Sequence, residues 1–424
     1  MPSPATTGAG RPLVLVNALL FDGTAETSIP DQGIWIGEDG TVQATGPSDD
    51  MISRARAHTP GVRVVDLDGD TVLPGLINSH VHLALGLPGP LADSTGRADS
   101  AELAFLMADS ARRTLRSGVT TVRLVGEPRF VDIALRSAID AGAVDGPRIF
   151  TAGQALCCTG GHGHDLDGLE TDGPEGFRRA TREQLRAGVD LIKVCVSGGI
   201  ASAHARISTP QLTDAEMAAV IDTAHDWGRK VTAHAGPAET IARAVRLGLD
   251  CVEHGYDMDS DVTDLMAARD VWYVPTLCVS RCEDFLIANN VPSWMIDRAL
   301  GAGPRHRESA RNALRSGVSI MMGSDMPPYA PFDDTTASVR ELEFLVEAGM
   351  SALEALRSAT VRPARWLGAD ASLGTLEPGK QADLVVTTGD PAHDISALRG
   401  LHLVIKGGVV HRDDLGRIPS GARA

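Results

Sequence analysis

The sequence predicts an α/β protein built around a (β/α)8 barrel of the TIM type, with a small β-sandwich domain assembled from both ends of the chain. Three observations support this prediction. Eight short apolar runs alternate with helical patterns in the middle of the chain, strand-like segments occur at both ends, and metal-ligand side chains follow several of the apolar runs. We expect residues 68–371 to form the barrel, residues 11–67 and 372–416 the β-sandwich, and residues 1–10 a disordered lead-in.

The two ends of the chain share a pattern of short runs in which apolar and other residues alternate, and Gly and Asp separate these runs. This pattern is typical of antiparallel strands joined by tight turns. The runs are Leu13–Val16, Gly33–Gly37 and Val62–Val65 near the N-terminus, and Ala382–Val386 and Leu403–Val410 near the C-terminus. Their similarity predicts one β-domain to which both ends contribute.

The middle of the chain contains eight apolar runs of strand length. They are Leu73–Ile77, Val119–Val125, Arg148–Ala152, Val189–Val196, Lys230–Ala233, Cys251–Glu253, Val271–Val274 and Val318–Met322. Eight alternations of strand and helix over about 300 residues favour the barrel. A doubly wound open sheet is the alternative, but no Gly-x-Gly-x-x-Gly follows the first run, which argues against the usual dinucleotide site.

Helices are indicated between several of these runs. Thr213 and Glu216 form a capping box, and a stop at Gly228 closes a helix whose apolar positions are Met217, Val220, Ile221, Ala224 and Trp227. A second capping box, Ser351 with Glu354, opens a helix through Leu353 and Leu356. Before the second run, an apolar face ending at Gly118 comprises Leu103, Leu106, Met107 and Leu115.

Composition excludes several classes of function. The chain has 424 residues, of which 43% are hydrophobic and 22% charged, and this is ordinary for a globular protein with a sizeable core. A formal net charge of −16 disfavours nucleic acid and anionic membrane surfaces as partners. No apolar run is long enough for a transmembrane helix, and Met1–Gly10 does not resemble a signal peptide. Six cysteines without a Cys-x-x-Cys pair suit a reducing compartment, so we expect a cytoplasmic protein.

Six side chains suggest metal chemistry. His80 and His82 stand two apart in a strand-like segment, so both imidazoles project from the same face. Lys193 lies within an apolar strand, where burying a charged ammonium is costly. His234, His254 and Asp325 each follow another run. Each of these residues alone has an ordinary structural explanation. Barrel active sites form where strands enter their following loops. Six ligand-type residues at the ends of five predicted strands therefore indicate one metal site.

The motifs around these residues resemble those of the amidohydrolase superfamily, in its imidazolonepropionase-related, prolidase-like branch with a carboxylated lysine. They are Pro74-Gly-Leu-Ile-Asn-Ser-His-Val-His, Ile192-Lys-Val-Cys-Val-Ser-Gly-Gly, Ala233-His-Ala, Val252-Glu-His-Gly, Gly323-Ser-Asp and the tail Leu373-Gly-Thr-Leu-Glu-Pro-Gly-Lys-Gln-Ala-Asp-Leu-Val-Val. The resemblance covers nearly the whole chain after about residue 11.

The resemblance implies a site with two divalent metal ions. His80, His82 and Asp325 would hold one ion, His234 and His254 the other, and Lys193 carboxylated by carbon dioxide would bridge them. A carbamate suits this position because a protonated Lys193 would be repelled by two dications. With the carbamate, the Asp325 carboxylate and a bridging hydroxide, the two dications leave the site a net charge of about +1. Zinc is the expected metal, although the same ligands accept cobalt or manganese.

The resemblance also implies the reaction, hydrolysis of an amide bond. The bridging hydroxide would attack the carbonyl of a small-molecule substrate, and Asp325 would act as general acid/base by passing a proton to the leaving amine. Such relatives remove C-terminal residues from dipeptides or N-acyl amino acids, and they often assemble, so a homo-oligomer is possible.

Two positions are candidates for contacting the substrate. The loop Gly160-Gly-His-Gly-His resembles one that presents a histidine to the substrate, which makes His162 the candidate and His164 its alternative. Relatives often carry a Tyr soon after the fifth-strand His to bind a substrate carboxylate. Here Gly236-Pro237 follow instead, so Tyr256 is the candidate for that role.

Three other functions remain as alternatives. A deaminase or cyclic amidohydrolase with a single metal does not need the bridging lysine, so Lys193 counts against it. A non-catalytic scaffold should lack ligands, whereas all six are present here. A lactonase or phosphotriesterase-like activity is compatible with the same nucleophile.

Overall fold

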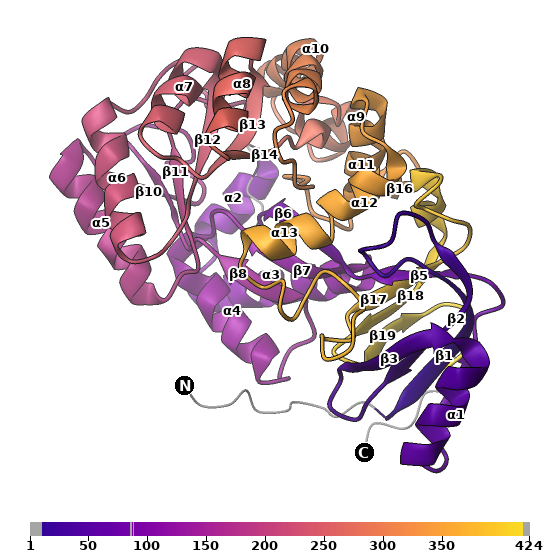
Figure 1. The fold of residues 1–424 in the computed structure, drawn as a ribbon. Coiled ribbons are helices and arrows are strands. Elements are labelled where there is room, and N and C mark those ends of the chain that lie inside the picture. The colour runs from indigo at the N-terminus through magenta and orange to yellow at the C-terminus, as the bar shows by residue number, and fades with distance from the viewer. Residues whose placement is uncertain (1–10, 85–86, 88, 419–424) are drawn as a thin grey trace.

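The computed structural model describes residues 11–84, 87 and 89–418 (Figure 1). The expected lead-in of residues 1–10 lies outside this part of the chain. The N-terminal strands, coloured indigo, lie beside the C-terminal strands, coloured yellow, so the two ends meet in space. Within the described residues, no helix combines the length and the apolar character that crossing a membrane requires.

Strands from both ends form one eight-stranded sheet. Its order is β19-β18-β17-β5-β1-β2-β3, with β4 also paired to β1. The strands are β1 (Leu13–Leu20), β2 (Ile29–Ile36), β3 (Val42–Pro47), β4 (Arg63–Asp66), β5 (Thr71–Pro74), β17 (Leu384–Thr387), β18 (Leu401–Lys406) and β19 (Val409–Asp413).

The expectation of purely antiparallel pairing in this sheet is wrong. β1 pairs antiparallel with β2, but it pairs parallel with β4 and with β5. The reason is α1 (Ser48–His58), a helix that the sequence analysis missed. A helix between β3 and β4 provides the crossover that parallel strands need. Met51 and Ala55 bury one face of α1 in a small core with Val14 and Trp35.

The predicted first barrel strand, Leu73–Ile77, is split at Gly75. Before it, β5 pairs with β17 of the terminal sheet; after it, β6 (Leu76–Val81) pairs with β7 (Val119–Leu124). A Cβ at Gly75 would lie 2.2 Å from Oγ1 of Thr120, so the backbone can pass this point only as glycine. The terminal sheet therefore reaches Pro74, beyond the expected boundary at residue 67.

The other strands of the middle region form two parallel sheets, β6-β7-β8 and β10-β9-β11-β12-β13-β14. Their bounds are β8 (Arg148–Thr151), β9 (Ala155–Cys157), β10 (Gly168–Glu170), β11 (Ile192–Cys195), β12 (Val231–Pro237), β13 (Cys251–Asp257) and β14 (Trp272–Val274). A short hairpin, β15 (Pro331–Phe332) with β16 (Thr335–Thr336), lies later in the chain.

Backbone hydrogen bonds link these two sheets into a ring. Asp190, just before β11, donates to Thr151 in β8 at 2.8 Å. The eighth predicted run, Val318–Met322, is extended but forms only a bridge, in which Ile320 pairs parallel with Tyr273 of β14. Met322 accepts from Ser79 of β6 at 2.8 Å. The ring order is thus β6, β7, β8, β11, β12, β13, β14 and residues 318–322.

Helices surround the ring. They are α2 (Pro90–Arg97), α3 (Ser100–Arg116), α4 (Val131–Asp140), α5 (Gly173–Ala187), α6 (Asp214–Asp226), α7 (Ala238–Arg246), α8 (Ser260–Ala268), α9 (Glu283–Ala288), α10 (Ser293–Arg315), α11 (Ala337–Ala348), α12 (Ala352–Ser358) and α13 (Val361–Trp366), with 3-10 turns η1 (Pro128–Phe130), η2 (Leu277–Ser280) and η3 (Ile395–Gly400).

The predicted N-terminal caps of two helices are confirmed. Thr213 caps α6 in a full capping box with Glu216, and the Ser351 side chain accepts from the backbone N–H of Glu354 at the start of α12. Two predicted core positions are wrong. Trp227 is 61% exposed, and Leu106 of α3 is 48% exposed although Leu103 and Met107 on the same helix are buried.

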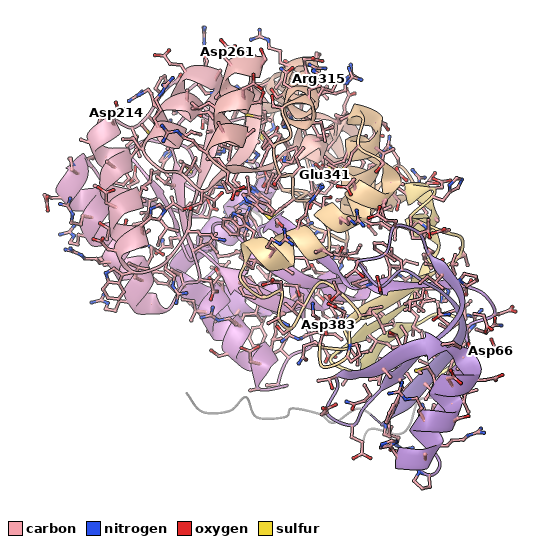
Figure 2. The ribbon with its side chains drawn as sticks, in the orientation of Figure 1. Asp66, Asp214, Asp261, Arg315, Glu341 and Asp383 are labelled. Atoms are coloured by element: carbon pink, nitrogen blue, oxygen red, sulfur yellow. The ribbon has the colours of Figure 1, made fainter. Side chains whose placement is uncertain are left out.

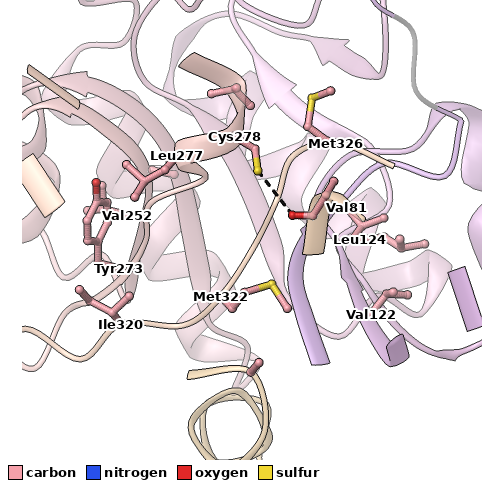
Figure 3. Packing of buried hydrophobic residues seen from close by; sticks show 14 of the residues in the cluster. Val81, Val122, Leu124, Val252, Tyr273, Leu277, Cys278, Ile320, Met322 and Met326 are labelled. Carbon is pink, nitrogen blue, oxygen red and sulfur yellow. Dashed lines mark hydrogen bonds between the residues drawn. The ribbon is translucent and has the colours of Figure 1, made fainter. Parts of the chain in front are cut away.

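The main core fills the inside of the ring and the space beneath the helices. Figure 3 shows part of it, where Val81 of β6 and Leu124 of β7 lie near Met322, and Val252 of β13 lies near Tyr273. The terminal sheet is tied to this body at Asp383 (Figure 2), whose carboxylate accepts from Gly407 at 2.7 Å and lies 3.4 Å from the guanidinium of Arg148 on β8. The ion pair joins the terminal sheet to the first residue of β8.

Candidate active site

All six side chains predicted as metal ligands line one cavity, at the ends of the ring strands. His80 lies in β6 and His82 directly after it; Lys193 lies in β11, His234 in β12, His254 in β13, and Asp325 shortly after residues 318–322. Two further predicted residues, His162 and Tyr256, line the same cavity. His164 is not among the residues that line it; its Nδ1 donates to the carbonyl of Gly161 in its own turn.

Three of these residues offer ligand atoms close enough for one cation. Nε2 of His80 and Nε2 of His82 lie 3.3 and 3.4 Å from Oδ1 of Asp325, and 3.4 Å from each other. One ligand atom from each residue falls within 4.8 Å of the others. Two nitrogens and one carboxylate oxygen form a donor set that suits a divalent transition metal.

The second pair of histidines lies next to the first. The ring of His254 lies 4.8 Å from that of His80 and 4.5 Å from that of His234, measured between centroids. Asp325 Oδ2 is 3.8 Å from His254 Nδ1. The four imidazoles therefore form a continuous group in the cavity that the buried Lys193, which is 3% exposed, also lines.

Each of the four imidazoles has one nitrogen held by an oxygen partner. His80 Nδ1 donates to Glu253 at 2.8 Å, and His82 Nδ1 donates to the carbonyl of Gly126 at 2.7 Å. His234 Nε2 donates to the carbonyl of Gly198 at 3.1 Å. His254 Nδ1 contacts Oγ1 of Thr276 at 2.7 Å. That hydroxyl itself donates to the carbonyl of Pro275, so it accepts from His254.

These partners fix the tautomers. In the neutral form of each ring, the lone pair lies on Nε2 of His80, His82 and His254 and on Nδ1 of His234. Such oxygen partners orient metal-ligating histidines and raise their basicity. The residues present therefore fit the binding of divalent cations.

The backbone around the ligands is strained and cross-linked. His254 and Asp325 have φ values of 67° and 50°, in the left-handed region that residues other than glycine seldom adopt. Asn78 connects the two segments that carry His80 and Asp325, since its amide donates to Ser324 at 2.8 Å and its carbonyl oxygen accepts from the backbone of His80 at 3.2 Å. The site geometry is thus imposed by its surroundings.

A buried ion pair beneath the site was missed by the sequence analysis. Glu253, one residue before His254, pairs with Arg123 of β7 and accepts from Thr232 as well as from His80. Burial alone would raise the pKa of Glu253, but the Arg123 guanidinium and His80 hold the pKa at about 2. The Val252-Glu-His-Gly motif contained this residue, but its spacing did not reveal the partner 130 residues away.

Asp167 is a second residue that sequence reasoning missed. It lies between β9 and β10, lines the cavity, and places Oδ2 3.0 Å from His82 Nδ1. Burial lowers the pKa of His82, but the carboxylates of Asp167 and Asp325 outweigh this and hold it well above its usual value. A cation at Nε2 would take the place of that extra proton. Asp167 stands three residues after the run Gly160-Gly-His-Gly-His, and this proximity was the available signal.

His162 is held against the second histidine pair. Its ring lies 4.0 Å from the ring of His234, and its Nδ1 is 2.7 Å from Oγ of Ser202. Burial lowers the pKa of His162 to about 4, so the ring is neutral at pH 7. Gly199 packs beneath it, and a Cβ there would lie 2.5 Å from the ring, which excludes a larger residue.

Arg298 of α10 fixes the loop that carries Ser202. Its Nη1 atom donates to the carbonyls of Gly199, Ser202 and Ala205, and also lies 3.3 Å from that of Ile200. Four carbonyls around one guanidinium nitrogen hold residues 199–205 to α10. Because Ile200 and Ala201 line the cavity, Arg298 determines the shape of this wall.

The protonation states of His234, His254 and Asp325 agree with a cation site. Burial lowers the pKa values of His234 and His254 well below the usual value, so both rings are neutral. Burial would raise the pKa of Asp325, but His80 and His82 hold it well below its usual range, so the carboxylate is charged. Neutral imidazoles and an ionised carboxylate are the forms that bind metals.

Comparison with known proteins identifies the family. The model of the amidohydrolase family matches residues 71–410. The chain belongs to the amidohydrolase family. A curated relative, the ochratoxinase of Aspergillus niger, is 30% identical over 362 residues, covering 77% of this chain and 72% of that protein.

Solved structures support the prolidase-like branch of this family. A Xaa-Pro dipeptidase with methionine bound in its active site has a TM-score of 0.82 and 32% identity, covering 95% of this chain and 100% of its own. A prolidase complexed with N-methylphosphonate-L-proline has a TM-score of 0.84 and 29% identity, with the same coverage. The resemblance inferred from the motifs is confirmed, and the chain is a hydrolytic enzyme of this family.

Proposed function

We propose that this enzyme is a binuclear metal-dependent amidohydrolase that cleaves an amide bond in an N-acyl amino acid or a dipeptide-like substrate. The observation that carries the proposal is the set of four imidazoles in one cavity, each with one nitrogen held by an oxygen partner and the other left for a ligand. The prolidase and ochratoxinase relatives support an amide as the bond that is cleaved.

The metal ligands are divided between two ions in this proposal. His80, His82 and Asp325 hold one ion, and His234 and His254 hold the other; Lys193, carboxylated on Nζ, bridges them. When bound, the two cations, which we propose to be zinc, polarise the amide carbonyl and lower the pKa of a water molecule. Carboxylation suits this position because Lys193 is buried in the same cavity as the proposed ions, and an anionic carbamate is attracted by two dications whereas an ammonium is repelled.

Asp325 is the proposed general acid/base. Its Oδ1 faces His80 and His82, while Oδ2 lies toward His254. Asp325 is ionised and 21% exposed, so Oδ2 can take a proton from the attacking water and deliver it to the leaving nitrogen. Proton transfer of this kind contributes about 10²–10⁴-fold to a rate.

His162 and Tyr256 are the proposed substrate contacts. Oγ of Ser202 accepts from the backbone of Gly199 at 3.2 Å and can donate its hydrogen to Nδ1 of His162, which leaves Nε2–H as a donor to the substrate. Tyr256 stacks on His254 with an interplanar angle of 2° and is buried at the cavity wall. Both side chains are neutral donors, which suits a carbonyl or carboxylate of the substrate.

The proposal also includes the full architecture and the location of the protein. We propose that the ring of eight parallel segments is a (β/α)8 barrel and that the terminal sheet belongs to a β-sandwich domain, with the boundary moved to Pro74 because β5 pairs with β17. A cytoplasmic protein acting on a small molecule, with no nucleic-acid or membrane partner, is consistent with the net charge of −16.

The test combines metal content with a substrate screen. We expect about two zinc equivalents per chain by elemental analysis, and hydrolysis of N-acyl amino acids or dipeptides by the zinc-loaded enzyme. Asp325→Asn should retain bound zinc and lose about 10²–10⁴-fold in kcat. One tightly bound metal with release of ammonia would instead assign a single-metal deaminase, and activity confined to lactones or phosphotriesters would reject the amide substrate.

A further inference from the structure

The end of β13 turns sharply at His254, a proposed ligand of the second ion. His254 and Gly255 have φ values of 67° and 58°, both in the left-handed region. Glycine adopts this conformation without strain, whereas a histidine keeps it only when its surroundings hold it there. His254 and Tyr256, two residues later, both line the catalytic cavity. The contacts that hold this turn therefore determine where the two side chains lie.

The carbonyl of His254 accepts hydrogen bonds from two buried side chains. The hydroxyl of Tyr273 on β14 donates to it at 2.6 Å, and Nε2 of His306 on α10 lies 3.0 Å from it. Both side chains are fully buried. A carbonyl oxygen has two lone pairs, so both of its acceptor positions are used. A change of the His254 backbone to an ordinary conformation would move this carbonyl and break both bonds.

His306 bonds a second carbonyl at the same time. Its Nε2 lies 2.7 Å from the carbonyl oxygen of Pro275. Carbonyl oxygens only accept, so Nε2 carries the hydrogen and shares it between the carbonyls of His254 and Pro275. On the other side of the ring, Nδ1 lies 2.9 Å from Oγ of Ser280, which fixes the orientation of the imidazole. His306 thus joins the end of β13 to the segment that follows β14.

These bonds form a closed network that runs from the side chain of His254 back to its own main chain. Nδ1 of His254 donates to the hydroxyl of Thr276, which donates to the carbonyl of Pro275. His306 joins that carbonyl to the carbonyl of His254. One network therefore holds both the imidazole and the main chain of His254, and Nε2 of His254 is left for a ligand.

His306 also contacts Tyr256, one of the proposed substrate contacts. The Tyr256 ring stacks on His254 with centroids 5.2 Å apart, and the His306 ring meets Tyr256 edge-on at 4.8 Å. His306 itself is not among the residues that line the cavity. Its effect on the reaction must therefore pass through the residues that it holds.

Two other side chains of α10 bond the chain just beyond β13. Oγ of Ser309 accepts from the backbone N–H of Met258 at 2.7 Å, and the amide of Asn312 donates to the carbonyl of Met258 at 2.8 Å. These bonds tie the same helix to the same segment, but they do not involve the carbonyl of His254. They provide a comparison that separates anchoring of the segment from positioning of the ligand.

We propose that His306 is a positioning residue of the active site, which holds the left-handed backbone of His254 and so directs its imidazole to the second ion. This inference rests on the proposed binuclear function. It gives the second ion a buried support that corresponds to Glu253 beside His80 at the first ion. The support acts through the main chain of the ligand instead of through its side chain.

The experiment compares two replacements of His306. His306→Leu removes the donor, whereas His306→Gln keeps an N–H near the place of Nε2. We expect the second zinc ion to bind His306→Leu at least about tenfold more weakly in a calorimetric titration, because loss of groups that orient a ligand lowers metal affinity by about 10–100-fold. His306→Gln should recover part of this affinity. Tyr273→Phe, which removes the other donor to the same carbonyl, should weaken the second ion as well.

A spectroscopic measurement makes the test independent of turnover. The visible absorption of the cobalt-loaded protein reports the geometry of its ligands, so it should change in His306→Leu and return toward the wild-type spectrum in His306→Gln. If His306→Leu does not fold, His306→Asn takes its place, since its shorter side chain carries an amide that does not reach the two carbonyls.

The matched control is Ser309→Ala on the same helix. It should lower the free energy of unfolding, because the N–H of Met258 loses its buried partner, and leave the second zinc affinity and the cobalt spectrum unchanged. An equal loss of zinc affinity in Ser309→Ala would assign the effect to the whole segment and overturn the proposal. Unchanged affinity and spectrum in His306→Leu, or in His306→Asn, also overturn it.

Failure of the proposed function would look different. If the wild-type protein binds a single zinc ion, the binuclear function is rejected, and a crystal structure of the metal-free His306 variant still decides the inference. In that structure we expect the φ of His254 to leave the left-handed region. A φ that stays near 67° overturns the positioning role whatever the number of ions.

Discussion

Nδ1 of His80 lies 2.8 Å from Oε2 of Glu253, and both side chains are buried. His80 belongs to β6 and Glu253 to β13, on different sides of the ring. The other carboxylate oxygen of Glu253 pairs with Arg123, which is also fully buried. A predicted metal ligand is thus oriented by a buried ion pair, and metal affinity and stability depend on the same carboxylate.

Replacing Glu253 by Gln should weaken both properties. The neutral amide orients His80 less well, and loss of such a partner lowers metal affinity by about 10–100-fold. Arg123 is left without its buried counter-ion, which should cost about 3–5 kcal/mol in the free energy of unfolding. Calorimetric zinc titration and urea unfolding measure the two effects.

The control is Glu343→Gln, which breaks the ion pairs of Glu343 with Arg340 and Arg399. It should lower stability and leave zinc affinity unchanged. If Glu253→Gln bound zinc as tightly as the wild-type protein, His80 would not be oriented by this contact.

Replacing Lys193 by Ala should reduce bound zinc from about two equivalents to about one and abolish turnover, because the proposed bridge between the ions is lost. Short carboxylic acids at millimolar concentration should restore part of the rate by occupying the same place. The control is Cys195→Ala, which alters a neighbouring cavity residue on the same strand. A near-normal rate in Lys193→Ala would contradict the bridging role.

Replacing Arg298 by Met should raise KM more than it lowers kcat. The loop of residues 199–205 would lose its four carbonyl contacts, and His162 would be less well held by Ser202. We expect KM to rise about tenfold, equivalent to about 1.4 kcal/mol of binding. Ser202→Ala should reproduce most of this effect without loosening the loop, as judged by amide hydrogen exchange.

The matched control for Arg298 is Arg305→Met on the same helix. Arg305 is 75% exposed and pairs with Asp257, so its loss should leave KM unchanged. A fall in kcat at constant KM in Arg298→Met would show that Arg298 does not act through substrate binding.

Glu341 of α11 should make stability depend on pH (Figure 2). Its carboxylate accepts from the backbone of Leu277 and of Cys278, each at 2.8 Å, and is fully buried. Burial raises its pKa from 4.5 to about 7 despite these hydrogen bonds. The folded state therefore binds more protons than the unfolded state between pH 4.5 and 7. The resulting stabilisation is fully present below pH 4.5 and is lost as pH rises through about 7.

The measurement is urea unfolding of the wild-type protein and Glu341→Gln at pH 4.5, 6 and 7.5. The difference in unfolding free energy between them should change with pH by an amount on the order of 3 kcal/mol, in the direction of a less stable wild type at higher pH. Taking the difference between the two proteins removes the contribution of the histidines. A difference that does not vary with pH would place the pKa of Glu341 near its ordinary value.

The order of the strand segments and the residues that gather in the cavity could be predicted from the sequence because both depend on local patterns. Apolar runs of strand length alternated with helical periodicity, and His80, Lys193, His234, His254 and Asp325 stood at their ends. Leu106 and Trp227 show the limit of such patterns. Helical periodicity predicted that both side chains lie on a buried helix face, but both are exposed. Whether a neighbouring element covers a helix face depends on packing across the fold.

The sequence by itself determined which segments form the ring and which side chains its strand ends present. Only the tertiary structure decided that β5 leaves the ring at Gly75, that Glu253 supports His80, and that Ser202 and Arg298 support His162. The physical reason is the separation along the sequence of the residues that interact. Alternation and capping act between residues a few positions apart, whereas these contacts join residues from 40 positions apart, for Ser202 and His162, to 316 positions apart, for Thr71 and Thr387, and form only in the folded chain.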